Sequence, residues 1–388
     1  MNNKRTIFLV ISSRASLSRV KTIIKAVNKH KLIDLKIVLM ASAALIEYGD
    51  TYSQVKNSNF DVISIIDVLD DKKDEVGQLY TVSACIKELT QLLKKNRPDA
   101  VITIADRYET IATAICSSYM NIPLIHIQGG EVSGNIDEKV RHAVTKLSDI
   151  HFVCTERAKK NVIKMGENPD CVYYTGCPSC DLAQEALDSN VSVNDIFKKY
   201  NIPFKKDYII VLQHSNTDEL NMTKSHINET YKAVSNLNYL VIWVLNNADA
   251  GSDIIRSFIS EKRNEENNII FCEGFTGEEF LILLKNCKCL VGNSSVGIRE
   301  CSYMGVPAIN IGSRQNHRER GSNLIDVMHN SEMIKNAILD SDKLRGKTSN
   351  LYGYGNSGET IAVLLETIDL RKKGSITFND ENFSNNNS

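Results

Sequence analysis

Two aspartates in the first half of the chain could transfer protons during a reaction. Asp106 and Arg107 come directly after the apolar run 101–104, and Asp137 stands at the start of a polar helical segment. At the end of a strand, a carboxylate can handle a proton while a neighbouring guanidinium binds phosphate. An aspartate that caps a helix leaves the same sequence pattern, so both interpretations stay open at this point.

The loop 128–131, with the sequence Gln-Gly-Gly-Glu, precedes the second of these aspartates. Its two glycines permit a tight turn close to a ligand. Glu131, Asp137 and Glu138 then place three acidic side chains in a short segment, where a cation or a role in proton transfer would relieve their repulsion. Glu131 therefore joins the candidates for catalysis, and so does Gln128, because its amide can orient water by donating and accepting hydrogen bonds.

Residues that could bind an anion follow the first apolar run of each half. The loop 12–18 contains Arg14 and ends at Ser18, and its backbone amides and positive charge suit an anion. A solvated arginine beside a serine cap is the alternative. His214 follows the run 208–212, and its place after the first strand of a second domain makes it a candidate for binding or catalysis.

The loop 292–295, Gly-Asn-Ser-Ser, joins an expected strand to an expected helix at 297–304. Successive amides and the hydroxyls of Ser294 and Ser295 would form a phosphate cradle that needs no metal. Glu300, placed about two turns into that segment, could bind ribose hydroxyls, and Arg314 could add a charge-assisted bond to the same diphosphate. Helix capping explains Ser294 alone but not this association.

Short apolar runs alternate with helical patterns, which is typical of parallel sheets covered by helices. The expected strands are 6–11, 36–40, 61–66, 100–104, 124–127, 150–153, 172–175, 208–212, 241–245, 269–272, 289–291 and 308–311. They predict an α/β protein with two Rossmann-like, doubly wound domains, 1–181 and 207–374, that face a cleft where ligands bind.

The remaining segments are expected to connect or cover these domains. The polar stretch 182–206 is predicted to be a linker, and 375–388, rich in Asn and Ser, a disordered tail. A terminal helix near 358–371 could pack back on the first domain. The apolar stripe that runs from Val76 to Leu93 in another helix is expected to face the first sheet.

Composition excludes several classes of partner. The 388 residues carry 46 Lys+Arg and 47 Asp+Glu, so no strong net charge attracts nucleic acid or an anionic membrane. No apolar stretch reaches the roughly 20 residues that span a bilayer, and a cytoplasmic protein is expected. Cys177 and Cys180 have the spacing of a redox pair, but we interpret this spacing as structural. Without a second pair or nearby histidines, no metal site is expected.

Several motifs together resemble the hydrolysing UDP-N-acetylglucosamine 2-epimerases, in order and spacing, over nearly the whole chain. They are Ala105-Asp106-Arg107-Tyr108-Glu109, the segment 126–134, Arg141-His142-Ala143, Gly176-Cys177-Pro178-Ser179, Gly292-Asn293-Ser294-Ser295 and the segment 310–315. This resemblance implies a fold like that of two-domain glycosyltransferases of the GT-B type. It implies a cytoplasmic homodimer or homotetramer that needs no cofactor and no metal.

The resemblance also implies roles for individual residues. Asp106 and Asp137 match carboxylates that do acid/base work, and His126 and His142 match residues near the sugar. The residues implied around the diphosphate are Arg14, Ser18, Arg107, His214, Ser294 and Arg314, with Asn247, Ser295 and Glu300 as further nucleotide contacts. The implied reaction converts UDP-N-acetylglucosamine and water into N-acetylmannosamine and UDP through a 2-acetamidoglucal, for nonulosonic (sialic) acid synthesis.

Other functions remain open. Many members of the family have Glu where this chain has Gln128, which could indicate a different sugar, such as UDP-N,N'-diacetylbacillosamine or a GDP-linked analogue on the legionaminic acid route. A nucleotide-sugar-binding protein without catalysis belongs to another class, and the presence of Asp106 and Asp137 argues against it. A retaining glycosyltransferase fits the fold alone, but the Asp106-Arg107 pair and the loop 128–131 argue against that too.

Overall fold

The computed structural model describes residues 4–46, 50–56, 60–70, 75–133, 136–204, 207–245, 251–263 and 268–370. The described chain divides into two compact units. Unit 1 contains the residues up to Val132, then Ile136–Pro178, and the residues from Asn356 onward, whereas unit 2 contains Ser179–Gly355. None of the described helices is long and apolar enough to cross a membrane.

Unit 1 is built on a parallel sheet of seven strands in the order β3-β2-β1-β4-β5-β6-β7. The strands are β1 (Arg5–Ile11), β2 (Ile33–Met40), β3 (Asp61–Ile66), β4 (Ala100–Ile104), β5 (Leu124–Ile127), β6 (Ile150–Val153) and β7 (Val172–Tyr174). β4, β5 and β6 are buried along their whole length, because helices cover both faces of a parallel sheet. Because both faces of these strands are buried, their sequences are mostly apolar.

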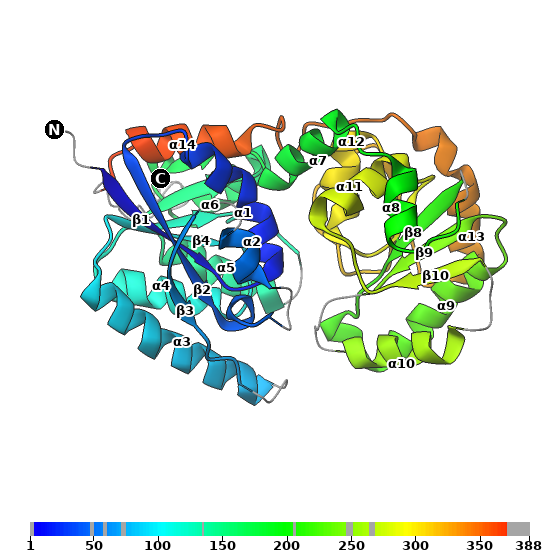
Figure 1. Cartoon of the computed structure of the whole chain (residues 1–388), viewed down its shortest axis with the longest axis horizontal. Helices are drawn as coiled ribbons and strands as arrows, with labels where there is room; N and C mark the ends of the chain where they lie inside the picture. Colours follow the sequence, from blue (N-terminus) through cyan, green and yellow to red (C-terminus); the bar gives the residue numbers. More distant parts are fainter. Residues whose placement is uncertain are drawn as a thin grey trace, which may run out of the picture. The chain divides into compact units, whose positions relative to one another are not determined.

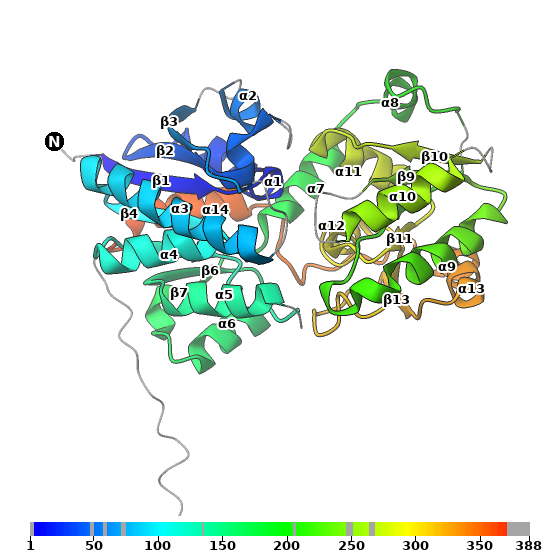
Figure 2. The same ribbon diagram turned by 90° about the horizontal axis from the view of Figure 1, so that it is seen from below.

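Helices cover both faces of the first sheet. They are α1 (Arg14–Val27), α2 (Thr51–Lys56), α3 (Glu75–Lys95), α4 (Thr110–Tyr119), α5 (Ile136–Lys146), α6 (Glu156–Lys164) and α14 (Ser357–Thr367). Ile7 and Leu9 of β1 pack in one core with α1 and α14, while Phe8 and Val10 pack in another with α3 and α4. Figure 2 shows α3 and α4 along one face of this sheet.

The stripe on α3 faces the sheet only in its second half. Leu89 and Leu93 are fully buried, but Val76, Leu79 and Tyr80 are 46%, 69% and 56% exposed. The helix of 21 residues is therefore longer than the part of it that packs on the sheet. The expectation that the whole stripe is buried was wrong.

α14 joins unit 1 although it follows all of unit 2 in the sequence. It lies beside α1 (Figure 1), where a side chain at Gly358 would come within 2.7 Å of the backbone of Thr22. Arg5 Nη1 donates to the carbonyls of Leu365 at 2.9 Å and Ile368 at 2.7 Å. These contacts fix the position of the terminal helix on the first sheet layer.

Unit 2 contains a second parallel sheet, of six strands in the order β10-β9-β8-β11-β12-β13. The strands are β8 (Tyr208–Leu212), β9 (Leu240–Val244), β10 (Ile269–Cys272), β11 (Leu290–Gly292), β12 (Ala308–Ile311) and β13 (Leu324–Val327). Sequence reasoning missed β13, an edge strand in which only Val327 is fully buried. The prediction of two doubly wound α/β halves is confirmed.

The helices of unit 2 are α7 (Pro178–Asp188), α8 (Val193–Lys199), α9 (Thr223–Ser235), α10 (Ser252–Lys262), α11 (Gly277–Asn286), α12 (Glu300–Met304) and α13 (Ser331–Asp340). The first two correct the expectation of a linker at 182–206. Ala183, Ala186, Ile196 and Phe197 are buried in the core of unit 2. Polar residues interrupt the apolar ones in both helices, so no continuous apolar run longer than two residues reveals them in the sequence.

Candidate functional site

The candidate residues of unit 1 follow three neighbouring strands. Arg14 comes after β1, Asp106 and Arg107 after β4, and Gln128 after β5, and these strands pair side by side in parallel. The carboxyl ends of parallel strands lie along the same edge of the sheet, which is where ligands bind in this class of fold. The topology therefore brings these residues to one edge of unit 1.

Asp106 forms an ion pair with Arg141. Arg141 Nη2 donates to Asp106 Oδ2, and Arg141 Nη1 donates to the carbonyl oxygen of Glu131. The Arg141 side chain is 2% exposed and that of Asp106 is 18% exposed. Sequence reasoning included Arg141 in a family motif but gave it no role of its own. The buried guanidinium favours the charged carboxylate at Asp106, and that form can accept a proton.

His126 supports the same turn from inside the protein. It is fully buried, its Nε2 donates to the carbonyl of Ala105 at 2.9 Å, and its Nδ1 lies 3.1 Å from Thr145 Oγ1. Burial lowers the pKa of His126 to about 3, so the ring is neutral. Ala105 has a φ of 65°, a left-handed conformation that costs energy for a residue with a side chain. His126 thus holds the strained residue immediately before Asp106.

Gln128 is held by both ends of its amide. Its Oε1 accepts from Arg19 Nη1 at 3.3 Å, and its Nε2 donates to Cys177 Sγ at 3.4 Å. The side chain is 2% exposed, and Glu131 is also buried. A side chain at Gly130 would lie 2.4 Å from the carbonyl oxygen of Ala158, so the turn requires glycine there. Sequence reasoning missed Arg19 as a partner of this loop.

Asp137 and His142 lie on α5, which carries Arg141 as well. Asp137 is in the first turn of the helix and is partly buried. His142 Nε2 lies 3.5 Å from Glu138 Oε1, one turn away on the helix. The helix begins at Ile136, so both Asp137 and Glu138 lie in its first turn.

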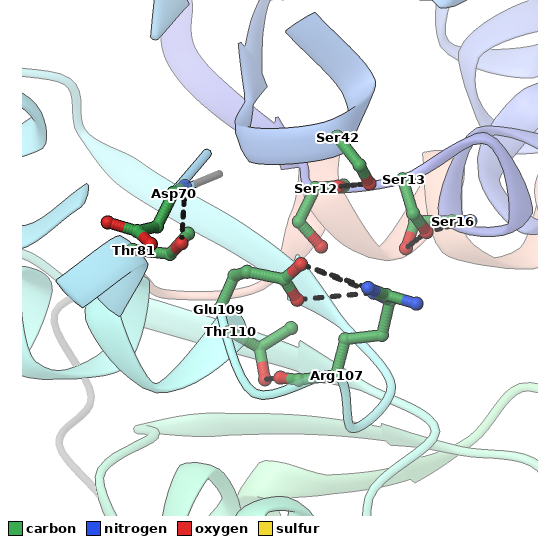
Figure 3. Close-up of polar contacts among 9 residues, drawn as sticks. All are labelled: Ser12, Ser13, Ser16, Ser42, Asp70, Thr81, Arg107, Glu109 and Thr110. Carbon is green, nitrogen blue, oxygen red and sulfur yellow. Dashed lines mark hydrogen bonds and ion pairs between the residues drawn. The ribbon is translucent and has the colours of Figure 1, made fainter. Parts of the chain in front are cut away.

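The remaining candidates in unit 1 are Arg14, Ser18 and Arg107. Arg14 is the exposed first residue of α1, and the hydroxyl of Ser18 donates to its carbonyl at 3.2 Å. Arg107 directs its guanidinium at the fully buried carboxylate of Glu109 (Figure 3), with Nε 3.2 Å from Oε2 and Nη2 3.1 Å from Oε1. Glu109 therefore orients Arg107, which stays 35% exposed. The sequence gave Glu109 no separate role.

In unit 2, Asn293 connects the loops that follow β8 and β11. Its Oδ1 accepts from the backbone N–H of His214 at 2.7 Å, and its Nδ2 donates to the carbonyl of His214 at 2.8 Å. Gly292 has a φ of 141°, and a side chain there would lie 2.0 Å from the carbonyl oxygen of Leu212. The sequence motif therefore combines a close strand contact with a side chain that fixes His214.

The segment after this motif differs from the expected helix at 297–304. Ser294 caps a short 3-10 turn, Ser295–Gly297, by accepting from the N–H of Val296 at 3.4 Å. α12 then begins at Glu300, which is its first residue and not two turns into a helix. The break falls at Arg299, whose φ and ψ are −97° and −73°. The amides of Ser294 and Ser295 still precede a helical turn, so an anion could bind there.

Two side chains after β12 bind the backbone of the same loop. Arg314 Nη1 and Gln315 Nε2 donate to the carbonyl oxygen of Asn293 at 3.1 Å and 3.0 Å. Both the loop after β11 and the Arg314 guanidinium are thus held in place before a ligand binds. Asn247, another candidate, lies outside the described residues.

A pocket in unit 2 opens beside these loops and encloses about 300 Å³ of space, part of it open to solvent. It is lined by Gln213, His214, Ser215, Asn216, Thr223, His226, Ile227, Ile255, Asn293, Ser313, Arg314 and His329. Burial lowers the pKa of His226, and it lowers the pKa of His329 to about 4. His226 and His329 were not recognised in the sequence, where no motif surrounds either residue.

Comparison with known proteins gives a consistent result. Residues 25–366 match a family described as UDP-N-acetylglucosamine 2-epimerase. The chain is 31% identical over 371 residues to the UDP-N,N'-diacetylbacillosamine 2-epimerase (hydrolyzing) of Legionella pneumophila, covering 95% of this chain and 97% of that protein. It is 32% identical over 339 residues to the polysialic acid biosynthesis protein P7 of Escherichia coli, covering 86% and 84% of the two chains.

Solved structures show the same fold. The UDP-GlcNAc 2-epimerase of Methanocaldococcus jannaschii, in complex with UDP-GlcNAc and UDP, has a TM-score of 0.77 at 20% identity and covers 93% of this chain and 99% of that one. The Neisseria meningitidis enzyme bound to UDP-GlcNAc has a TM-score of 0.78 at 18% identity, with 93% and 99% of the two chains covered.

Proposed function

Because the chain belongs to the UDP-N-acetylglucosamine 2-epimerase family, we propose that it is a hydrolysing 2-epimerase that converts a UDP-linked 2-acetamido sugar and water into UDP and the free 2-epimer. The observation that carries the chemistry is the Asp106–Arg141 ion pair at the end of β4. It supplies a carboxylate in its charged form, held in one orientation by a buried partner. A charged carboxylate in a fixed orientation is the form that can act as a general base.

The proposed reaction takes place in two steps, an elimination and then an addition of water. In the first, a carboxylate removes the proton at C2 while the bond from C1 to the UDP oxygen breaks, which leaves a C1–C2 double bond in a 2-acetamidoglucal. In the second, a proton returns to C2 on the opposite face and the oxygen of water bonds to C1. We assign the proton transfers to Asp106 and Asp137, with Gln128 and Glu131 orienting water.

The nucleotide leaves as an anion, so the groups that bind it must stabilise negative charge in the transition state. We assign this role in unit 2 to His214, Ser294, Ser295 and Arg314, with Glu300 at the ribose. The support for this assignment is that Asn293 and its partners fix the loop and the guanidinium in advance. Preorganised donors lose little energy to reorganisation when the charge develops.

The sugar is proposed to be N-acetylglucosamine, which gives N-acetylmannosamine for sialic acid synthesis. A second candidate is N,N'-diacetylbacillosamine, favoured by the similarity to the Legionella pneumophila enzyme over 95% of this chain. A GDP-linked form is a variant of that candidate. Gln128 is uncharged, and its amide is already occupied by Arg19 and Cys177, so it does not itself distinguish these sugars.

The test is to incubate the protein with UDP-N-acetylglucosamine, UDP-N,N'-diacetylbacillosamine and their GDP counterparts in deuterated water and to identify the products by NMR. We expect UDP and a free 2-epimer that carries deuterium at C2. A nucleotide-linked epimer without free sugar would contradict hydrolysis. No turnover of any of these compounds, with UDP binding retained, would favour a binding protein instead.

A further inference from the structure

Three side chains that are far apart in the sequence converge beside the pocket of unit 2. Glu219 lies in the 3-10 turn Thr217–Met222 after β8, His226 in the first turn of α9, and His329 just after β13. One potential ligand atom from each lies within 4.8 Å of the other two. His226 Nδ1 is 3.8 Å from Glu219 Oε2, and the two imidazole rings stack with their centroids 3.5 Å apart.

His329 is partly buried, and one of its ring nitrogens is unused. Its Nδ1 is buried and has no hydrogen-bond partner within the described part of the chain. Its Nε2 packs against Gly312, where a side chain would come within 2.2 Å of that nitrogen. Leaving a buried polar atom unbonded destabilises the fold. A ligand at Nδ1 would remove that destabilisation.

The carboxylate of the cluster is oriented by a second layer of hydrogen bonds. The hydroxyl of Ser313 donates to Glu219 Oε1 at 2.9 Å, and Asn216 Nδ2 donates to the same hydroxyl at 3.0 Å. Hydrogen bonds of this kind hold the side chains that bind a metal ion in the required orientation. Two neutral imidazoles and one oriented carboxylate form a donor set that zinc uses, whereas Mg²⁺ and Ca²⁺ prefer oxygen ligands alone.

We propose that unit 2 binds one divalent transition-metal ion of the zinc class through Glu219, His226 and His329, with a fourth position open. This departs from the sequence expectation of no metal site, which followed from the absence of closely spaced ligands. The rings are now parallel, at 3° to one another, and a metal must lie in the plane of each ring that binds it. Binding therefore requires the half-buried His226 ring to tilt away from His329.

The ion would also change the pocket. His226 and His329 line the same pocket as His214 and Arg314, so a bound cation would add positive charge to a site already suited to anions. The metal site itself does not depend on the proposed epimerase reaction. It can be tested by metal binding and thermal stability, without any substrate.

The experiment uses the full chain after removal of metal with a chelator. Titration with ZnCl₂ in a calorimeter is expected to give one ion per chain and a rise in melting temperature, while MgCl₂ gives neither. His226→Ala and Glu219→Gln are expected to weaken zinc binding at least tenfold. Both positions are half-buried or partly exposed, so the variants should fold, and circular dichroism checks this.

His30→Ala is the matched control, because His30 also lies beside two carboxylates, Glu359 and Glu366, but has no second imidazole there. It should bind zinc as the parent protein does. Co²⁺ reports on the type of ligand, because binding to a cysteine thiolate would give an intense charge-transfer band. The ten cysteines are all buried, so this band is not expected. Unchanged zinc affinity in both cluster variants, a thiolate band with Co²⁺, or no zinc binding at all would overturn the proposal.

Discussion

The guanidinium of Arg141, almost completely buried in α5, forms an ion pair with the carboxylate of Asp106 at the end of β4. The pair joins a residue expected to do chemistry to one to which the sequence gave no function. It also links two elements of unit 1, because Arg141 binds the carbonyl of Glu131 with its other nitrogen.

Arg141→Met should lower the free energy of unfolding by about 3 kcal/mol, because it leaves a poorly solvated charge without its partner. Denaturant unfolding measures this loss. In a double-mutant cycle with Asp106→Asn, the double variant should be more stable than the sum of the two losses predicts. Strict additivity would show that the two side chains do not interact.

Asp106→Asn and Asp137→Asn should each fold and bind UDP but turn over at least about a hundredfold more slowly, since each keeps its shape and loses a titratable carboxylate. Product release measured by NMR is the readout. Asp61→Asn, at an exposed position on β3, is the control and should behave as the parent protein. Near-normal turnover in either test variant would end that residue's assignment as an acid/base group.

Arg314→Ala and Ser294→Ala should each weaken UDP binding about ten- to hundredfold by calorimetry, because each removes a hydrogen bond that we propose to the charged diphosphate. Arg256→Ala changes a half-exposed arginine that pairs with Glu273 on the surface of the same unit, and it should leave affinity unchanged. If both test variants bind UDP normally, the nucleotide does not bind at this loop.

Gln128→Glu should preserve turnover or alter it modestly, because a carboxylate still accepts from Arg19. Gln128→Leu removes both hydrogen bonds of a buried amide, leaves Arg19 without this acceptor, and should lower stability by about 1–3 kcal/mol and turnover at least tenfold. Steady-state kinetics and thermal unfolding on the two variants separate these effects. Equal activity of the two variants would show that the polar group at this position is unimportant.

Glu279 should make unit 2 sensitive to acid. Burial alone would raise the pKa of Glu279, but hydrogen bonds from Lys199, Tyr200 and Thr276 lower it to about 2. A carboxylate with a lowered pKa stabilises the fold above its unfolded pKa, and this contribution is lost as the pH falls from about 4.5 to about 2.

Glu279→Gln should therefore cost about 1–2 kcal/mol at neutral pH and progressively less as the pH falls through that window. Unfolding of both proteins at several pH values gives the difference. Glu278→Gln, at the exposed neighbouring position in the same helical turn, should show no such trend. If the free energies of unfolding of the parent and of Glu279→Gln differed by the same amount at all pH values, the stability would not depend on the protonation of Glu279.

Much of the fold could be predicted because its central strands are apolar throughout. Runs such as 100–104 and 208–212 stand out in the sequence, and residues directly after them, such as Asp106 and His214, could be assigned to the binding edge of a sheet. Edge strand β13 gave no such signal, because its side chains are mostly only partly buried.

The partners of the candidate residues could not be predicted, because they depend on packing between elements. Arg141 looks like an ordinary helical arginine until β4 and α5 are placed side by side. Glu219 and His329 are 110 positions apart and meet only because β8 and β13 belong to the same sheet, with β11 and β12 between them. The residue pattern of one segment carries no information about its contacts with distant segments.

The position of α14 has a consequence for how the protein is synthesised. Translation releases β1 and α1 first, and the helix that covers them emerges only after the whole of unit 2 has been made. Ile361, Ala362 and Leu365 complete the core around α1, so a nascent chain exposes that apolar surface on the ribosome until the end. Unit 2 is nearly continuous in sequence and can finish folding earlier. Premature termination after Gly355 would thus leave unit 1, not unit 2, as the part that aggregates.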